Sequence, residues 1–209
     1  MYLGIDLTCG EGKPSACALL DGSGRPVSIA KVGANAEILD WGKGGQSRIV
    51  AIDSPLFYPR GMNCLEEPCQ CGKCDPGPWA LRAAERRLFQ EGISCYPTTK
   101  RTFIKPMIYR AIKLASAFKA MGCQVIEVFP YASKVQLFGK PIPKKRTLAG
   151  RRWLRQRLEP LIEGLAAQPS LNHDQLDALV ASYTAYLYRH GYGEEIGDPA
   201  EGVIVVPAR

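Results

Sequence analysis

The chain has 209 residues, of which 46% are hydrophobic and 22% are charged. This composition excludes an intrinsically disordered protein, and the length suffices for one α/β domain with a sizeable core. Lysine and arginine outnumber aspartate and glutamate by 27 to 20, which gives a net charge of +7 and permits a polyanionic partner without requiring one.

The N-terminal segment does not resemble a signal peptide, because Asp6 interrupts its apolar start and no basic segment precedes it. No apolar run approaches the roughly 20 residues that a membrane helix needs. We therefore expect a cytoplasmic protein with no membrane partner. In that compartment the eight cysteines are expected to be thiols or metal ligands rather than disulfides.

The first part of the chain predicts a three-strand meander, a helix and a fourth strand. The first strand ends on an acid, and the turn DGSG joins the second and third strands as a hairpin. A short amphipathic helix then precedes a continuous apolar strand that also ends on an acid. The predicted ranges are 1–8, 15–20 and 25–32 for the first three strands, 35–43 for the helix and 48–56 for the fourth strand.

Residues 57–104 interrupt this rhythm with many prolines, glycines and cysteines, and we expect an insertion that contains one helix near 79–92. A helix with a proline near its start and a glycine at its end follows, and then another buried strand. A basic loop runs into a helix, and a last helix and a short strand close the chain. These later elements are predicted at 106–122, 123–130, 140–165, 173–191 and 201–207.

This order of elements matches the ribonuclease H-like α/β architecture. We expect a mixed five-stranded sheet with helices on both faces, followed by the short terminal strand. Residues 1–209 are expected to form a single domain of this kind, with 57–104 as a Cys-rich insertion. In this architecture the first strand pairs with the strand that follows the first helix, so that the two strand ends lie side by side.

Three of the predicted strands carry an acid: Asp6, Asp53 and Glu127. A carboxylate in an apolar strand costs free energy unless it is paired or binds a cation. Open α/β sheets place ligand sites at the carboxyl ends of strands. One such acid could be a turn cap, but two acids at adjacent strand ends predict a site.

The last helix adds Asp174 and Asp177 on a stripe of small residues that would let the helix approach a sheet closely. The helix dipole alone would favour Asp174 in the first turn, but it explains Asp177 less well. Acids three apart on a helix lie roughly 5–6 Å apart at Cβ. Four converging carboxylates would bind Mg²⁺ or Mn²⁺, and two such ions can activate water and stabilise the leaving oxygen of a phosphodiester.

Six blocks extend in order along nearly the whole chain: GIDLT, AIDSPL, RAAERRLFQEGISCYP, IEVFPYAS, HDQLDALVASYTAYL and EGVIVVP. Together they resemble the domain-of-unknown-function family 429, which is described as predicted nucleases with a ribonuclease H-like fold. The helix HDQLDALVAS is also similar to the last helix of the bacterial Holliday-junction resolvases. The wider superfamily implies two-metal phosphodiester cleavage, with Asp6, Asp53, Asp174 and Asp177 as catalytic metal ligands. Resolvases often have Glu where Asp53 stands, and Glu127, without a secure counterpart, would be an auxiliary catalytic residue.

A short loop holds four cysteines, which would suit a structural zinc site: Cys64, Cys69, Cys71 and Cys74. Their spacing differs from the usual two separated Cys-x-x-Cys knuckles, so that reduced thiols or an iron–sulfur cluster remain alternatives. A zinc ion would stabilise an insertion that has little core of its own.

Candidate nucleic-acid contacts fall in two places. Arg82, which the resemblance includes together with Glu85, would reach a phosphate or would form a surface ion pair with Glu85. Tyr96 and Pro97 also match the family pattern, but the sequence suggests no chemistry for them beyond setting a turn. A larger basic cluster near Trp153 would neutralise phosphates or form a solvated helix face. It includes Lys144, Lys145, Arg146, Arg151 and Arg152.

The leading hypothesis is a metal-dependent nuclease that hydrolyses phosphodiester bonds in DNA or RNA. A first alternative is a nucleotide-binding phosphotransferase or ATPase, because GIDLTCGEG at 4–12 faintly resembles the first phosphate loop of the actin and sugar-kinase group. Those proteins need a second comparable domain, for which this chain is short. A second alternative is a non-catalytic nucleic-acid-binding module that keeps the acids for folding or for magnesium.

Overall fold

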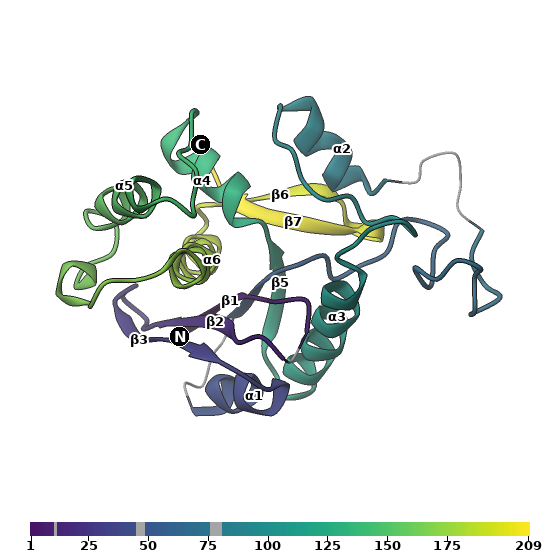
Figure 1. The fold of residues 1–209 in the computed structure, drawn as a ribbon, viewed down its shortest axis with the longest axis horizontal. Coiled ribbons are helices and arrows are strands. Elements are labelled where there is room, and N and C mark those ends of the chain that lie inside the picture. Colours follow the sequence, from purple (N-terminus) through teal and green to yellow (C-terminus); the bar gives the residue numbers. More distant parts are fainter. Residues whose placement is uncertain (11, 45–48, 76–80) are drawn as a thin grey trace.

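The structure, a computed structural model, describes residues 1–10, 12–44, 49–75 and 81–209 (Figure 1). Three sequence predictions extend beyond these residues. Glu11 of the candidate phosphate loop, Arg48 at the start of the fourth predicted strand, and residues 79–80 of the predicted insertion helix all lie outside the described part of the chain.

A seven-stranded mixed sheet forms the centre of the fold, in the order β3-β2-β1-β4-β5-β7-β6. β1, β4, β5 and β7 run parallel, whereas β2, β3 and β6 are antiparallel to their neighbours. The ribonuclease H-like α/β class predicted from the sequence is thereby confirmed. The strands are β1 Tyr2–Asp6, β2 Ser15–Leu20, β3 Pro26–Val32, β4 Ile49–Asp53, β5 Gln124–Val128, β6 Gly193–Asp198 and β7 Gly202–Pro207.

The predicted number of five sheet strands was wrong, because both C-terminal strands join the same sheet. β7 pairs with β5, and β6 forms the far edge. β6 reads GEEIGD, a polar stretch without the apolar alternation that indicates a strand. Its extended conformation comes from antiparallel pairing with β7 along its whole length, which only the folded chain can supply.

Helices cover both faces of the sheet. α6 packs across one face with α4 and α5 beside it, whereas α1 and α3 lie on the opposite face and α2 packs on β6 and β7 (Figure 1). The helices are α1 Asn35–Gly44, α2 Ala83–Gln90, α3 Lys105–Ala120, α4 Pro130–Phe138, α5 Leu148–Leu158 and α6 His173–Arg189, with 3₁₀ turns η1 Leu165–Ala167 and η2 Pro199–Glu201. Among the described residues, no helix combines the length and hydropathy that crossing a membrane requires.

α6 lies directly on β1 because the contact is made of small residues. A Cβ atom added to Gly4 would lie 2.1 Å from the carbonyl oxygen of Ala178 and 2.3 Å from the backbone nitrogen of Ser182. The Ser182 hydroxyl donates a hydrogen bond of 2.7 Å to the carbonyl oxygen of Tyr2. Only a hydrogen atom fits at position 4, so this glycine sets how closely α6 approaches the sheet.

The pairing register places two of the strand acids side by side. Asp6 and Asp53 are the last residues of β1 and β4, and they are direct partners in the parallel pair. Side chains alternate along a strand, so Asp53 points to the same face as Ala51, which packs in the cluster beneath α6. Glu127 is the partner of Ile52, and its side chain therefore starts from the opposite face.

Candidate active site

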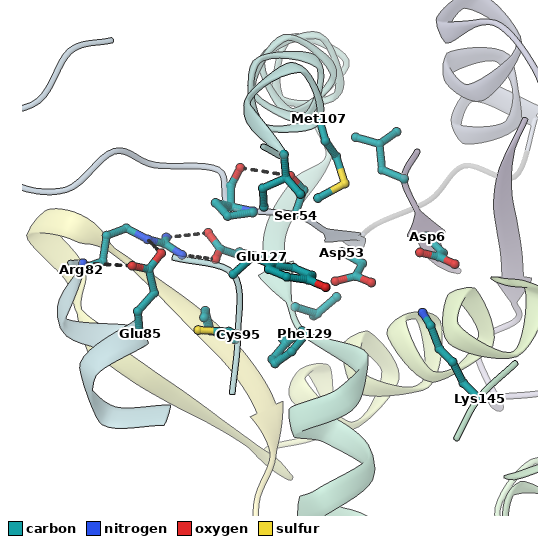
Figure 2. A pocket seen from close by; sticks show the side chains of 16 residues that line it. Asp6, Asp53, Ser54, Arg82, Glu85, Cys95, Met107, Glu127, Phe129 and Lys145 are labelled. Carbon is teal, nitrogen blue, oxygen red and sulfur yellow. Dashed lines mark hydrogen bonds and ion pairs between the residues drawn. The ribbon is translucent and has the colours of Figure 1, made fainter. Parts of the chain in front are cut away.

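A cavity of about 230 Å³ lies at the carboxyl ends of the central parallel strands (Figure 2). Asp6, Asp53 and Lys145 line one end of it. A second charged group, Arg82, Glu85 and Glu127, lines the other end. Apolar side chains, among them those of Met107 and Phe129, lie between the two groups.

The Asp6 and Asp53 carboxyl groups are difficult to ionise together. Burial raises the pKa of Asp6 well above its ordinary value, and the negative charges of Asp53 and Asp177 raise it further. Burial also raises the pKa of Asp53 to about 7, with Asp177 as the next cause, while Lys145 acts in the opposite direction. A cation bound between such carboxylates would favour their ionised forms.

Asp177 is the most deeply buried acid of the group, with 1% of its surface exposed. Two lysines neutralise its carboxylate: Lys134 Nζ donates to Oδ1 at 2.8 Å, and Lys145 Nζ donates to Oδ2 at 2.6 Å. Lys134 comes from α4 and is also buried, whereas Lys145 comes from the loop before α5. Lys134 was not among the site residues predicted from the sequence, although a lysine within the mainly apolar run VFPYASKVQLF was a usable signal.

Asp174 lies at the edge of this group, in the first turn of α6. The Asn172 side chain caps the helix by accepting hydrogen bonds from the backbone nitrogens of Asp174 and Gln175. The Asp174 carboxylate is 2.6 Å from His173 Nδ1 and 3.4 Å from Lys31 Nζ. Its negative charge still contributes to the raised pKa of Asp6, so Asp174 is electrostatically coupled to the cavity.

The donor chemistry of this cluster fits a hard divalent cation. Asp6, Asp53, Asp174 and Asp177 offer only carboxylate oxygens, the ligands that Mg²⁺ and Mn²⁺ prefer. They come from two strand ends and one helix, as the sequence predicts. The oxygen atoms of these four acids do not lie as close together as the sulfur atoms of Cys64, Cys69, Cys71 and Cys74. In the described part of the chain, only those four cysteines bring three or more candidate ligand atoms within 4.8 Å of one another.

Glu127 has a different environment from the other predicted catalytic acids. Arg82 Nη1 and Nη2 donate to its two carboxylate oxygens at 2.8 Å and 2.5 Å, and the backbone nitrogen of Leu56 donates to Oε2 at 2.8 Å. Glu127 is buried and held from two sides. The structure thus places it in a structural ion pair next to the carboxylate cluster rather than among the cluster's acids.

Arg82 is equally enclosed, with 1% of its surface exposed. Besides the bidentate pair with Glu127, its Nε donates to Glu85 at 3.2 Å. Glu85 also accepts hydrogen bonds from the backbone nitrogen and hydroxyl of Thr98, at 2.9 Å and 2.5 Å. Arg82 is therefore not displayed to solvent as a phosphate ligand, and its pair with Glu85 is not a surface ion pair. The network instead joins α2, β5 and the loop before α3.

The four cysteines of the 57–104 segment converge on one point. Neighbouring sulfur atoms are 3.6 Å apart for Cys64 and Cys69, 3.4 Å for Cys69 and Cys71, 3.5 Å for Cys71 and Cys74, and 3.7 Å for Cys64 and Cys74. Tetrahedral zinc with Zn–S bonds of 2.3 Å needs sulfurs about 3.8 Å apart. The arrangement therefore fits a single tetrahedral metal ion. The Tyr109 hydroxyl accepts a hydrogen bond from the Leu65 backbone, and this contact attaches the cysteine loop to α3.

The predicted basic cluster borders the carboxylates. Lys145 bridges the two features through its ion pair with Asp177. Lys144, Arg146 and Arg152 are exposed and Arg151 is half-buried. Thr147 caps α5 by accepting a hydrogen bond of 3.0 Å from the Gly150 backbone.

The chain is similar to two solved structures and matches one protein family. A Thermus thermophilus RuvC structure aligns with a TM-score of 0.48 and 16% identity, covering 90% of this chain and 95% of that one. T. thermophilus RuvC in complex with a Holliday junction substrate aligns with a TM-score of 0.46 and 16% identity, covering 91% and 97%. No curated protein sequence matches. Residues 4–202 match the family described as "Protein of unknown function (DUF429)", and the chain belongs to that family.

Proposed function

We propose that this protein is a nuclease that uses Mg²⁺ or Mn²⁺ to hydrolyse phosphodiester bonds in DNA or RNA. The observation that carries this proposal is the cluster of carboxylates at the cavity, whose negative charges repel one another. The pKa of Asp6 is raised first by burial and then by the charges of Asp53 and Asp177, which lie far from it in the sequence. Such mutual repulsion opposes folding, and a site for divalent cations gives a physical reason for it.

Asp6, Asp53, Asp174 and Asp177 would hold the ions, which when bound supply an activated water and stabilise the leaving oxygen. Lys134 donates a hydrogen bond of 2.8 Å to Asp177 Oδ1 and fixes its side chain against α4. Lys145 has 45% of its side chain exposed and lies where the cavity meets the basic cluster. It can exchange its contact with Asp177 for a phosphate oxygen of the substrate, and the exposed basic residues beside it would hold neighbouring phosphates.

The buried Arg82 network has a positioning role in this proposal. It holds β5 and α2 at fixed places around the cavity, because Glu127 belongs to β5 and Arg82 immediately precedes α2. Glu127 is accordingly assigned to the support of the site and not to the ligands of the ions.

A metal-dependent cleavage screen tests the proposal. Purified protein is incubated with single-stranded, duplex, hybrid and branched oligonucleotides in Mg²⁺, Mn²⁺ or EDTA. We expect cleavage of at least one substrate with metal and none in EDTA. Asp6→Asn, prepared identically, should lose at least about 100-fold in rate, since metal binding and the reaction share this ligand.

Calorimetry tests whether the carboxylates bind the ion, and cleavage then separates an enzyme from a binding module. The wild-type protein should bind Mn²⁺, and Asp6→Asn should not. Nucleic-acid binding without metal-dependent cleavage of any substrate would favour the non-catalytic module. Cleavage that is equal in wild type and Asp6→Asn would identify a contaminating nuclease.

We further propose that residues 57–104 are an insertion in a single domain of residues 1–209 and that Cys64, Cys69, Cys71 and Cys74 bind one structural zinc ion. The sulfur spacing supports zinc, although an iron–sulfur cluster would use the same thiolates. Elemental analysis should find about one zinc per chain. Cys71→Ser should lose the metal and melt at a lower temperature, whereas Cys9→Ser, at an exposed cysteine outside the cluster, should retain both. Iron with visible absorbance would refute zinc.

A further inference from the structure

An exposed aromatic pair stands beside the carboxylate cavity. Tyr96 and Phe103 have 62% and 70% of their surfaces exposed, and their ring centroids are 4.7 Å apart in an edge-to-face arrangement. Large aromatic side chains are costly to leave in water, and exposed ones near a site often mark a surface that binds a ligand. The sequence alone suggested no chemistry for Tyr96 beyond setting a turn.

Tyr96 is continuous with the proposed active site, because its side chain lines the same cavity as Asp6 and Asp53 while most of its surface remains open to solvent. The cavity wall next to it is apolar and includes Ile104 and Met107. A ligand that contacts the Tyr96 ring would therefore also reach the edge of the carboxylate group. The part of the ligand that contacts Tyr96 would have a flat apolar face.

The loop that presents the two rings is held in place. Thr98, two residues after Tyr96, is fully buried and donates two hydrogen bonds to Glu85. The backbone of Thr102 donates to the carbonyl oxygen of Thr99 at 3.1 Å. The rings thus project from an ordered support, so that little conformational entropy would be lost when a ligand stacks on them.

Lysine and arginine residues flank Phe103 in the sequence TTKRTFIK. Arg101 has 89% of its side chain exposed and lies 3.8 Å from Glu67, and Lys105 lies 3.5 Å from Glu66. The Arg101 contact is exposed, so it is weak and can be exchanged for phosphate. Aromatic rings flanked by lysine and arginine are the combination that binds the bases and backbone of unpaired nucleic acid.

We propose that Tyr96 and Phe103 form a stacking platform for an unpaired nucleobase of the substrate. This inference rests on the proposed nuclease function and specifies its substrate class: a nucleic acid with a single-stranded, bulged or branch-point base near the cleaved phosphate. In a continuous duplex, neighbouring base pairs cover both faces of each base, so no face is available to Tyr96. An unpaired base exposes its face and can stack on the ring.

Equilibrium binding in the Asp6→Asn background tests the platform without cleavage. Three fluorescent oligonucleotides of related sequence serve as probes: a blunt duplex, the same duplex with one extra unpaired base, and the single strand. Tyr96→Ala should weaken binding of the two probes with unpaired bases about 5- to 100-fold and of the blunt duplex less than about 2-fold. Phe103→Ala should act in the same direction.

Two control variants make the test specific. Tyr96→Phe retains the ring and should bind within about 2-fold of the parent, which separates stacking from hydrogen bonding by the hydroxyl. Tyr192→Ala removes an equally exposed tyrosine, 65% exposed, that follows the far end of α6. It lies about 25 Å along the helix from the acids and should change no affinity.

The possible outcomes distinguish the two proposals. If Tyr96→Ala weakens the binding of all three probes equally, or of none, the stacking platform is overturned while the nuclease assignment stands. Failure of the parent protein to bind any probe, together with no metal-dependent cleavage by wild type, overturns both. Selective loss of the probes with unpaired bases, with the melting temperature unchanged, supports the platform.

Discussion

At the scale of single residues, the site is defined by which charges the fold forces together. A carboxyl group whose pKa rises on folding binds its proton more tightly in the folded state. Asp53 has a pKa of about 7 against an ordinary value of 3.8. Its contribution to the free energy of unfolding is therefore fully present below about pH 3.8 and is lost as the pH rises to about 7. Asp6 acts in the same direction.

Charges on every neighbouring element take part in this titration. Asp174 and Asp177 on α6 raise the pKa of Asp6, and Asp177 also raises that of Asp53. Lys145, from the loop before α5, lowers both pKa values, and Lys134 of α4 lowers that of Asp53. As the pH rises through about 7, Asp53 gains a negative charge that Asp177 repels and that Lys145 and Lys134 only partly compensate.

Asp53→Asn should stabilise the metal-free protein at alkaline pH. In EDTA at pH 8 we expect the variant to exceed wild type by about 1–3 kcal/mol in free energy of unfolding. This is less than the roughly 4 kcal/mol that the full rise of the Asp53 pKa would give without solvent screening. The advantage should shrink as the pH falls to 5, as measured by urea denaturation. Asp40→Asn, at an exposed acid of α1, is the control and should show no such pH dependence. Equal stability of wild type and Asp53→Asn at pH 8 would contradict the prediction.

A second prediction at this scale concerns the buried arginine. Arg82→Met would leave Glu85 and Glu127 buried without their partner, and should lower the free energy of unfolding by about 3–5 kcal/mol. Arg87→Met, which removes a largely exposed arginine of α2 that pairs with Glu91, should cost less than about 0.5 kcal/mol. Chemical denaturation measures both.

Glu127→Gln tests the separation of this ion pair from the metal ligands. The variant should lose stability but bind Mn²⁺ within about 3-fold of wild type, because Glu127 is bound to Arg82 and is not assigned as a ligand. A loss of Mn²⁺ binding as large as that of Asp6→Asn, in folded protein, would return Glu127 to the ligand set.

At the scale of elements, the packing of α6 on β1 determines where the helix acids lie. The approach is so close that the backbone of Ala178 and Ser182 fills the space a side chain at position 4 would need. Any substitution of Gly4 must move the helix away from the strand. That movement would also carry Asp177 away from Asp6.

Gly4→Ala should therefore destabilise the protein by about 2–3 kcal/mol or more and weaken Mn²⁺ binding as well. Gly22→Ala is the matched control, because an added Cβ atom meets nothing within 4 Å there, and it should change stability by less than about 0.5 kcal/mol. Thermal denaturation and Mn²⁺ calorimetry provide the two readouts. Unchanged metal affinity in a destabilised Gly4→Ala protein would show that helix position and ion binding are independent.

At the scale of the whole molecule, the net charge of +7 is distributed so that exposed basic residues border an acidic cavity. The basic loop and α5 lie beside the carboxylates because Lys145 joins them to Asp177. A polyanion attracted to the basic residues would be brought to the cavity mouth, while its reacting phosphate would need cations to approach the carboxylates.

Salt dependence tests this arrangement. The affinity of the protein for nucleic acid is measured at several salt concentrations. Replacing Lys144, Arg146 and Arg152 by alanine should reduce the slope of log affinity against log salt concentration by about 2–3, close to one unit per lost phosphate contact. A control triple substitution of Lys43, Lys113 and Arg189, exposed residues of α1, α3 and the end of α6, removes the same charge elsewhere. It should leave the slope nearly unchanged, and an equal effect of both triples would indicate non-specific attraction only.

Part of the fold could be predicted from local patterns, and the exceptions have physical reasons. Strands such as β4 and β5 are mainly apolar runs, and this composition predicts a buried strand. The helix α4 was missed because Ala132, Ser133 and Lys134 are all buried, so that no polar face gives it a helical period. The edge strand β6 was missed because its sequence is polar and its pairing partner imposes its conformation.

The candidate site was also only partly predictable. The sequence indicated Asp6 and Asp53 because both end apolar strands, and the structure makes them direct partners. Glu127 gives the same local signal, an acid in an apolar strand, yet it pairs with Arg82. Whether an acid in a strand is a ligand or half of an ion pair depends on the side chain that faces it, and that side chain can come from anywhere in the chain.

By itself, the amino-acid sequence determined the ribonuclease H-like class, the family and the strand and helix ends that carry acids, because these follow from apolar periodicity and short ordered motifs. Only the tertiary structure decided which charges meet. It placed Asp177 between two lysines, enclosed Arg82 with two glutamates, and set Tyr96 at the edge of the cavity. The physical reason is that burial and Coulomb interactions depend on distances in space, which local sequence does not specify.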